Sequence, residues 1–148
     1  MEIHEKYMRE ALREASFAAS EDEVPIGAVI ICRGRIVGKG HNMTEKLNDP
    51  TAHAEMIAIT AATEALGGKY LNDCTLYVTV EPCPMCAGAI LNSRINKVVY
   101  GAKDPRGGAL GSLVDLRSYP FFHTPEVISG VCEDECRQLL QSFFKNKR

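Results

Sequence analysis

Two short motifs constrain this chain more than any other feature, because their side chains must meet at one point. The first is His53-Ala54-Glu55, and the second is Pro82-Cys83-Pro84-Met85-Cys86. Histidine and cysteine are the side chains that bind zinc, and Cys83 and Cys86 share one face if they open a helix. His53 also opens a predicted helix. The fold therefore has to bring two helix N-termini together around a single ion.

The candidate ligands His53, Cys83 and Cys86 leave one corner of a tetrahedral zinc site for a water. Zinc lowers the pKa of such a water and makes it a nucleophile at neutral pH, so the pattern favours hydrolysis. Glu55 follows His53 by about 200° of helical turn. It is therefore predicted to stay off the metal and to transfer protons as a general acid and base. The alternatives are a closed structural zinc site and residues that bind no metal.

The composition indicates one globular domain. A chain of 148 residues, 45% hydrophobic and 24% charged, is expected to form a single zinc-dependent domain over residues 1–148. No apolar run reaches the roughly 20 residues that span a bilayer, and the N-terminus is too charged for a signal peptide. We therefore expect a soluble protein of the cytoplasm. There, six cysteines indicate metal ligands and buried thiols rather than disulfides.

Apolar periodicity predicts helices that alternate with strands. Residues 5–19 show helical spacing, and the apolar run Ile26–Cys32 predicts a buried strand that Arg33-Gly34 turns into a second strand. The alanine-rich residues 53–66 predict a helix that ends at Gly67. Alternation of this kind implies a three-layer α/β fold. The remaining predictions are a strand at 76–80, a helix at 84–92, a strand at 97–100, irregular structure at 101–125 and a helix at 132–145.

The segments around both motifs resemble the bacterial tRNA adenosine deaminases of the TadA type, within the cytidine and deoxycytidylate deaminase superfamily. The resemblance covers nearly the whole chain. It implies a three-layer α/β/α, cytidine-deaminase-like fold with a central mixed five-stranded sheet, one zinc ion per subunit and a homodimer. It further implies hydrolytic deamination of adenosine to inosine at the wobble position (34) of a tRNA anticodon. The matching segments are residues 23–29, 49–55, 75–89, 93–95, 98–104 and 111–113, with Asp134-Glu135-Cys136, Leu139-Leu140 and Phe143-Phe144 of the last helix.

The resemblance also implies how the substrate is held. Asn42 is expected to hydrogen-bond the flipped nucleotide, Asp104 to contact the nucleotide backbone and Phe144 to pack near the anticodon loop. Val24 and Pro82 are expected to wall the base pocket. A base must leave its stack to be deaminated, and a single-stranded loop permits this at least cost. Candidate phosphate contacts are Arg94, Lys97, Lys103, Arg106 and the tail 145–148, despite a net charge of −2.

The chemical hypothesis assigns both proton transfers to Glu55. It deprotonates the zinc-bound water, hydroxide attacks C6 of adenine, and Glu55 then protonates the departing ammonia. Backbone N–H groups near Cys83 and Ala54 are candidate donors to the substrate. The plainer interpretations are that Asn42 caps a turn and that Asp104, which precedes Pro105, is an ordinary turn residue.

Two other functions stay open. A deaminase of a free base or nucleotide, such as guanine or cytosine, would carry the same zinc motif without needing a C-terminal helix with Phe143-Phe144 and a basic end. A catalytically silent RNA-binding subunit would have no need for Glu55. One segment departs from the family pattern: Phe122-His123-Thr124 stands where the family often carries Asn-His-Arg. We expect the grip on RNA to differ there.

Overall fold

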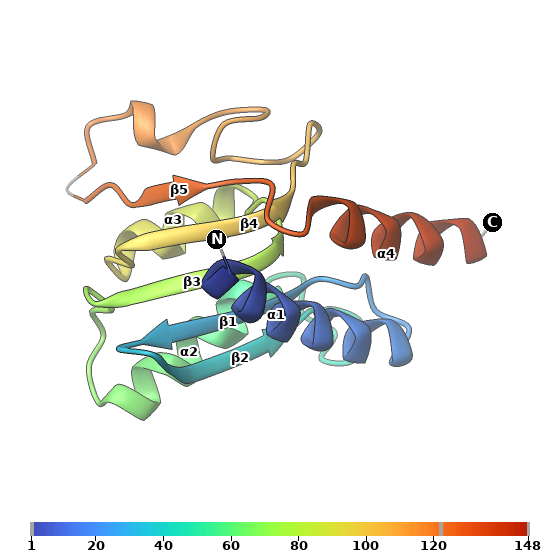
Figure 1. Cartoon of the computed structure of the whole chain (residues 1–148), viewed down its shortest axis with the longest axis horizontal. Helices are drawn as coiled ribbons and strands as arrows, with labels where there is room; N and C mark the ends of the chain where they lie inside the picture. The colour runs from blue at the N-terminus through green and yellow to red at the C-terminus, as the bar shows by residue number, and fades with distance from the viewer. Residues whose placement is uncertain (1, 122, 148) are drawn as a thin grey trace.

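The computed structural model describes residues 2–121 and 123–147. Within them, helices and strands alternate along the chain (Figure 1). No helix in these two ranges is both long enough and apolar enough to cross a membrane. The elements are α1 Glu2–Ser20, β1 Gly27–Cys32, β2 Arg35–His41, α2 Ala54–Leu66, β3 Cys74–Val80, α3 Pro84–Asn92, β4 Lys97–Ala102, the 3-10 helix η1 Leu116–Ser118, β5 Glu126–Ile128 and α4 Glu133–Asn146.

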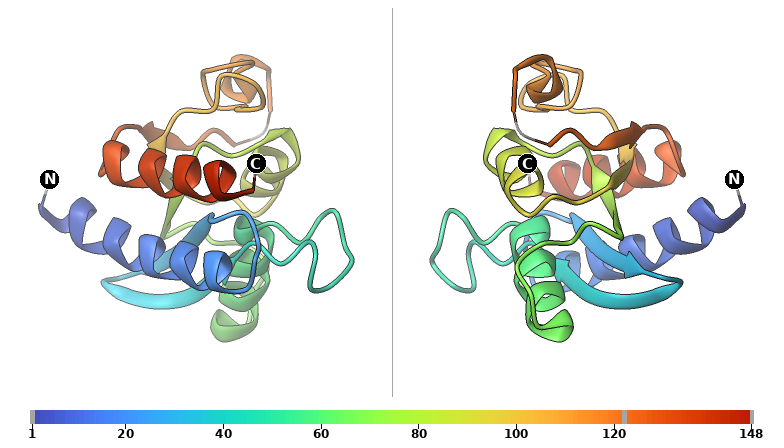
Figure 2. Two further views of the ribbon diagram at one scale, coloured as in Figure 1. Left: turned by 90° about the vertical axis from the view of Figure 1, so that its right-hand side faces the viewer. Right: turned by 90° about the vertical axis from the view of Figure 1, so that its left-hand side faces the viewer.

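The strands form one mixed sheet in the order β2-β1-β3-β4-β5. Strand β1 runs antiparallel to both β2 and β3, whereas β3, β4 and β5 are parallel. Parallel neighbours require a crossover connection, and α3 provides it between β3 and β4. Helices α1 and α4 cover one face of the sheet, and α2 and α3 cover the other (Figure 2). The predicted three-layer architecture with a mixed five-stranded sheet is confirmed.

The central strands supply two cores because successive side chains of a strand point to opposite faces. On β1, Ala28 and Ile30 belong to the core beneath α2 and α3, whereas Val29 and Ile31 belong to the core beneath α1 and α4. On β3, Tyr77 joins the second core. A strand buried on both faces reads as a continuous apolar run, which is why the sequence predicted β1.

Both helices that carry the metal motifs begin and end within one residue of the predicted bounds. Helix α2 begins directly after His53 and ends at Gly67, whose φ of 70° forms a left-handed C-terminal cap. Helix α3 begins at Pro84, in the first turn, where the missing N–H of proline costs no hydrogen bond. The two N-termini are thereby fixed by local sequence.

Strand β2 allows α2 to lie unusually close to the sheet. A Cβ at Gly40 would stand 2.3 Å from the carbonyl oxygen of Ala54, the first residue of α2. No side chain fits at that distance, so glycine is required. This contact sets the height of α2, and with it the position of His53, above the sheet.

Candidate metal centre

The three predicted zinc ligands converge although they come from two segments. Donor atoms of His53, Cys83 and Cys86 all lie within 4.8 Å of one another. Nδ1 of His53 is 3.6 Å from Sγ of Cys83 and 3.5 Å from Sγ of Cys86. Tetrahedral zinc, with bonds of about 2.0 Å to nitrogen and about 2.3 Å to sulfur, separates such donors by about 3.5 Å. The donor set therefore fits zinc.

The number of donors distinguishes two kinds of zinc site. Among the residues that the structure describes, no fourth histidine, cysteine, aspartate or glutamate joins the cluster. Structural zinc sites use four protein ligands, whereas catalytic sites use three. The geometry thus favours a catalytic centre over the closed structural site.

Local structure presents each ligand at a helix N-terminus. His53 is the N-cap of α2, with extended backbone at φ −77° and ψ 156°. The turn before it is held by Asp49, whose Oδ1 accepts hydrogen bonds from the N–H and hydroxyl of Thr51. Cys83 is the N-cap of α3. Helix N-termini carry partial positive charge, which stabilises the thiolate form that a metal needs.

The two cysteine thiols shift each other's pKa in opposite directions. The interaction with Cys86 lowers the pKa of Cys83 to about 5, and the same interaction together with burial raises the pKa of Cys86. Zinc binding requires both sulfurs as thiolates, so loading releases at least one proton.

Glu55 lies beside the ligands in a buried position. Its side chain is 4% exposed, and burial is the main cause that raises its pKa to about 7. Its carboxyl group lies close enough to Cys83 and Cys86 to interact with both electrostatically. A carboxyl group whose pKa lies near the working pH is suited to taking and returning a proton.

Asn42 occupies the junction between the strands and the first motif. Its N–H donates to the carbonyl of Ile26 at 3.1 Å, and the next residue, Met43, donates to Ala52, which precedes His53. Asn42 is 6% exposed, and its Oδ1 is the one buried side-chain polar atom in the described part of the chain that lacks a hydrogen-bond partner. Such atoms are rare in folded proteins. This oxygen therefore suits a ligand rather than a turn cap.

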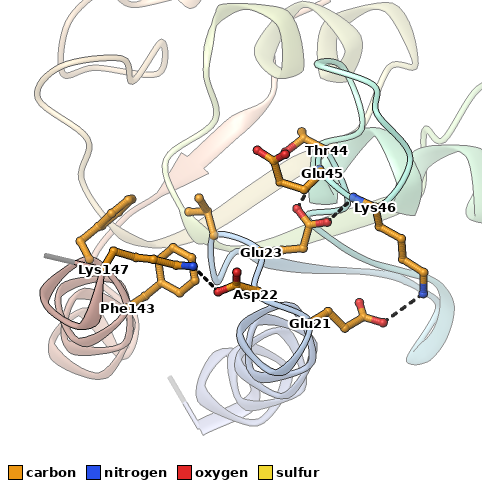
Figure 3. A pocket seen from close by; sticks show the side chains of 10 residues that line it. Glu21, Asp22, Glu23, Thr44, Glu45, Lys46, Phe143 and Lys147 are labelled. Carbon is orange, nitrogen blue, oxygen red and sulfur yellow. Dashed lines mark hydrogen bonds and ion pairs between the residues drawn. The ribbon is translucent and has the colours of Figure 1, made fainter.

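A cavity of about 820 Å³ separates the end of α1 from the end of α4 (Figure 3). Val24 and Phe144 both line it, whereas Pro82, the other predicted wall of the base pocket, does not. Lys147 closes one side through an ion pair with Asp22. The full lining is Glu21, Asp22, Glu23, Val24, Thr44, Glu45, Lys46, Phe143, Phe144 and Lys147.

A second groove, of about 1010 Å³, lies on the other side of Phe144. Asp104 lines it, and Oδ1 of Asp104 also accepts from the N–H groups of Arg106 and Gly107, at 3.1 and 3.2 Å. Pro82 is buried, and its carbonyl accepts from Ala109 at 2.8 Å. Neither cavity is lined by the metal ligands. The structure thus brings the three zinc ligands together, and it places Val24 and Asp104 in two cavities that share Phe144, whereas Asn42 and Pro82 line neither cavity.

The predicted phosphate contacts do not form one patch. Arg106 and Lys145 line the groove beside Phe144. Arg94 instead follows the far end of α3, where its guanidinium lies 4.1 Å from the ring centre of Tyr70. Two of the candidate cations, Arg106 and Lys145, thus lie in the groove that Phe144 also lines.

Two residues of the sequence predictions, Phe122 and Arg148, lie outside the described residues. Within the departing segment, Nε2 of His123 hydrogen-bonds the carbonyl of Ile95 at 2.8 Å. This bond ties the segment to the end of the α3–β4 connection.

The sequence predictions missed two buried carboxylates near the candidate pocket. Glu23, 1% exposed, accepts from the N–H groups of Glu45 at 3.1 Å and Lys46 at 2.7 Å (Figure 3). Glu81, 3% exposed, accepts from residues of the loop after β4. Each directly precedes a predicted pocket wall, Val24 or Pro82. The available signal was an acidic residue at the border of an apolar run.

Comparison with known proteins supports the same chemistry. The family model of the cytidine and deoxycytidylate deaminase zinc-binding region matches residues 1–102. A tRNA-specific adenosine deaminase of Bacillus subtilis is 50% identical over 145 residues, which are 97% of this chain and 90% of that protein. The family match agrees with the predicted zinc cofactor.

Solved structures extend the comparison to the fold. One, from a study of A-to-I editing by tRNA:A34 deaminases, superposes with a TM-score of 0.85 at 47% identity, covering 91% of this chain and 99% of that one. A guanine deaminase from Bacillus subtilis superposes with a TM-score of 0.65 at 43% identity, covering 68% of this chain and 64% of that one. The predicted cytidine-deaminase-like fold is confirmed.

Proposed function

The chain belongs to the cytidine and deoxycytidylate deaminase family and, within it, to the tRNA-specific adenosine deaminases, and from this we propose that it hydrolyses adenosine to inosine at the wobble position (34) of a tRNA anticodon. One observation carries the proposal: three zinc donors at tetrahedral spacing lie beside a buried glutamate. The choice of substrate rests on the relatives, which are named as tRNA-specific adenosine deaminases.

His53, Cys83 and Cys86 would hold the zinc ion, which supplies Lewis-acid activation of a water for attack on carbon. Glu55 performs the proton transfers. Its carboxylate accepts one proton from the attacking water and delivers it to the leaving amino group, so that adenosine and water give inosine and ammonia. Burial, which raises the pKa of Glu55 to about 7, adapts the group to both transfers.

The remaining predicted site residues are proposed to bind the substrate. Asn42 supplies its unpaired oxygen to a hydroxyl or amino donor of the flipped nucleotide. Phe144, 48% exposed between the two cavities, offers a ring face for stacking with a loop base. Asp104, Val24 and Pro82 shape the approach to the base. Arg106 and Lys145, which line the groove beside Phe144, are proposed to contact phosphates of the RNA backbone.

The enzyme is further proposed to act as a homodimer in the cytoplasm, where tRNA is its partner. Support for a dimer comes from the segment after Ser112, where four apolar side chains are at least 40% exposed in the single chain. Large exposed apolar patches often mark interfaces, and these four side chains lie close together in the sequence, between positions 113 and 121. Light scattering during gel filtration measures the mass directly. The four exposed apolar side chains of this segment are Leu113, Val114, Tyr119 and Phe121.

The test uses an anticodon stem-loop RNA with adenosine at position 34. We expect inosine, detected by nuclease digestion and mass spectrometry, and an equal amount of ammonia. Free adenosine, cytidine and guanine run in parallel, and guanine deserves a place because a guanine deaminase is among the similar structures. Turnover of guanine without turnover of the stem-loop would contradict the proposal.

Glu55→Ala supplies the mechanistic control. Because Glu55 is not a metal donor, the variant should retain one zinc per chain while its kcat falls by roughly 10²–10⁴-fold, the usual contribution of general acid–base catalysis. A variant that loses zinc and keeps its activity would refute the role of Glu55.

A further inference from the structure

Glu81 is a buried carboxylate that takes no part in zinc binding or in the proton transfers assigned to Glu55. It stands between the last residue of β3 and the Pro82-Cys83 segment, and its side chain is 3% exposed. Its own N–H donates to the carbonyl of Ala102, at the end of β4, at 2.9 Å. Burying a carboxylate is costly unless hydrogen bonds replace its hydration, so its surroundings show what it does.

Among the residues that the structure describes, the hydrogen bonds that this carboxylate accepts all come from the loop after β4. Oε1 accepts from the N–H of Asp104 at 3.1 Å and from the hydroxyl of Ser112. Oε2 accepts from the N–H of Leu110 at 3.1 Å and from the N–H of Ser112 at 3.0 Å. All four partners are donors, and three of them are backbone groups. Residues 104–112 therefore wrap around one side chain.

The loop also requires glycine where it passes the carboxylate. A Cβ at Gly108 would lie 2.3 Å from the carboxyl carbon of Glu81 and 2.5 Å from each oxygen. Ala109, the next residue, donates its N–H to the carbonyl of Pro82 at 2.8 Å. The same loop is thus fastened to two consecutive residues, Glu81 and Pro82, that lead directly into the ligand Cys83.

We infer that Glu81 is a positioning residue, which fixes the Asp104 loop against the segment that carries the pocket wall Pro82 and the zinc ligand Cys83. Its carboxylate acts on the fit of the RNA substrate and leaves the metal and the proton transfers unchanged. The inference rests on the proposed function for its substrate. It adds to that function a side chain, Glu81, that holds the protein loop 104–112 at a set distance from the metal site.

Glu81→Gln is the sharpest variant, because it keeps the size of the side chain and changes only its hydrogen bonding. The amide retains one accepting oxygen and turns an NH₂ group toward loop donors, which repels them. Hydrogen bonds to charged groups are strong, so the KM for the anticodon stem-loop should rise roughly tenfold or more. We expect kcat to change by less than about threefold, since Glu55 and the ligands stay in place. Zinc content should remain one per chain.

One further variant tests the same contact from the loop side, and a second variant is a control outside it. Ser112→Ala removes one of the four bonds and should raise KM by a factor of about two to five, with the fold kept. It tests the idea even if Glu81→Gln does not fold. Glu64→Gln makes the same chemical change at an exposed glutamate of α2 and should leave both constants unchanged.

A readout without catalysis separates this inference from the proposed function. Trypsin cleavage after Arg106, which is exposed in the loop, should be faster in Glu81→Gln than in the wild type or Glu64→Gln. A wild type that leaves the stem-loop unchanged refutes the proposed function, and faster cleavage still supports the loop role. If KM stays within about twofold, or kcat falls together with zinc content, or cleavage is unchanged, the positioning role is overturned.

Discussion

Replacing Asn42 with leucine should make the protein more stable and less active, and the opposite signs identify a substrate-binding residue. Oδ1 of Asn42 is buried and has no hydrogen-bond partner within the described residues. Leucine branches at the same carbon as asparagine and has a similar size. The substitution therefore removes the unpaired oxygen while leaving the backbone bonds of Asn42 and Met43 intact.

The two effects have comparable size. A buried polar atom without a partner costs about 1–3 kcal/mol, and leucine returns that free energy to the folded state. For a chain of this length, each kcal/mol raises Tm by about 2–4 °C. With substrate bound, leucine instead leaves a donor of the nucleotide unpaired at a similar cost, which lowers kcat/KM about 5- to 150-fold.

Thermal unfolding of the zinc-loaded protein gives Tm, and inosine formation in the anticodon stem-loop gives kcat/KM. Asn72→Leu, at an exposed asparagine, is the matched control and should change neither quantity substantially. A lower Tm with unchanged kcat/KM would show that Asn42 supports the fold, and the substrate role would have to be abandoned.

Three other perturbations test the metal site and the packing around it. Cys83→Ser should reduce zinc content, measured by elemental analysis, well below one per chain, because a hydroxyl is a poor zinc ligand; retention of stoichiometric zinc would argue against this donor set. Gly40→Ala should destabilise the fold by about 1–3 kcal/mol in urea unfolding, since its Cβ would meet the carbonyl of Ala54 at 2.3 Å, whereas Gly68→Ala, with open space, should not. Burial lowers the pKa of His4 in the folded protein below its usual value of 6.5. Neutral His4 therefore contributes to the stability of the fold above pH 6.5, and this contribution is lost as the pH falls through the pKa of the folded state. In His4→Gln, the free energy of unfolding measured in urea at several pH values should not show this decrease. The same pH dependence in the variant and the wild type would exclude His4 as its source.

The sequence predicted the elements around the metal accurately because their signals are local. Helix α3 covers the predicted residues 84–92, with Pro84 in its first turn, and α2 ends at Gly67 as its left-handed cap requires. Helix α4 begins at Glu133, one residue later than predicted, because Cys132 adopts a left-handed backbone at φ 54°. Such a conformation at a non-glycine residue is set by the connection from β5 and has no local sequence signal.

The substrate side was less predictable. Glu23 and Glu81 resemble surface acids in the sequence, yet each is buried under N–H groups of a loop that lies some 20 or more residues further along the chain. Val24 and Asp104 line two different cavities, and Phe144 of α4 lines both of them. Their roles in binding RNA stay predictions for the variants above to test.

What the sequence determined by itself was the chemistry: three zinc donors, each at a helix start, and a glutamate beside the first of them. Residue type and helical spacing carry that information, because helix starts depend on a few neighbouring residues. Only the tertiary structure decided the distances of 3.5 and 3.6 Å among the donors, the unpaired oxygen of Asn42 and the loop held by Glu81. Those features depend on how β1, β3 and β4 align and on how closely the helices approach the sheet, and such long-range packing leaves no local pattern.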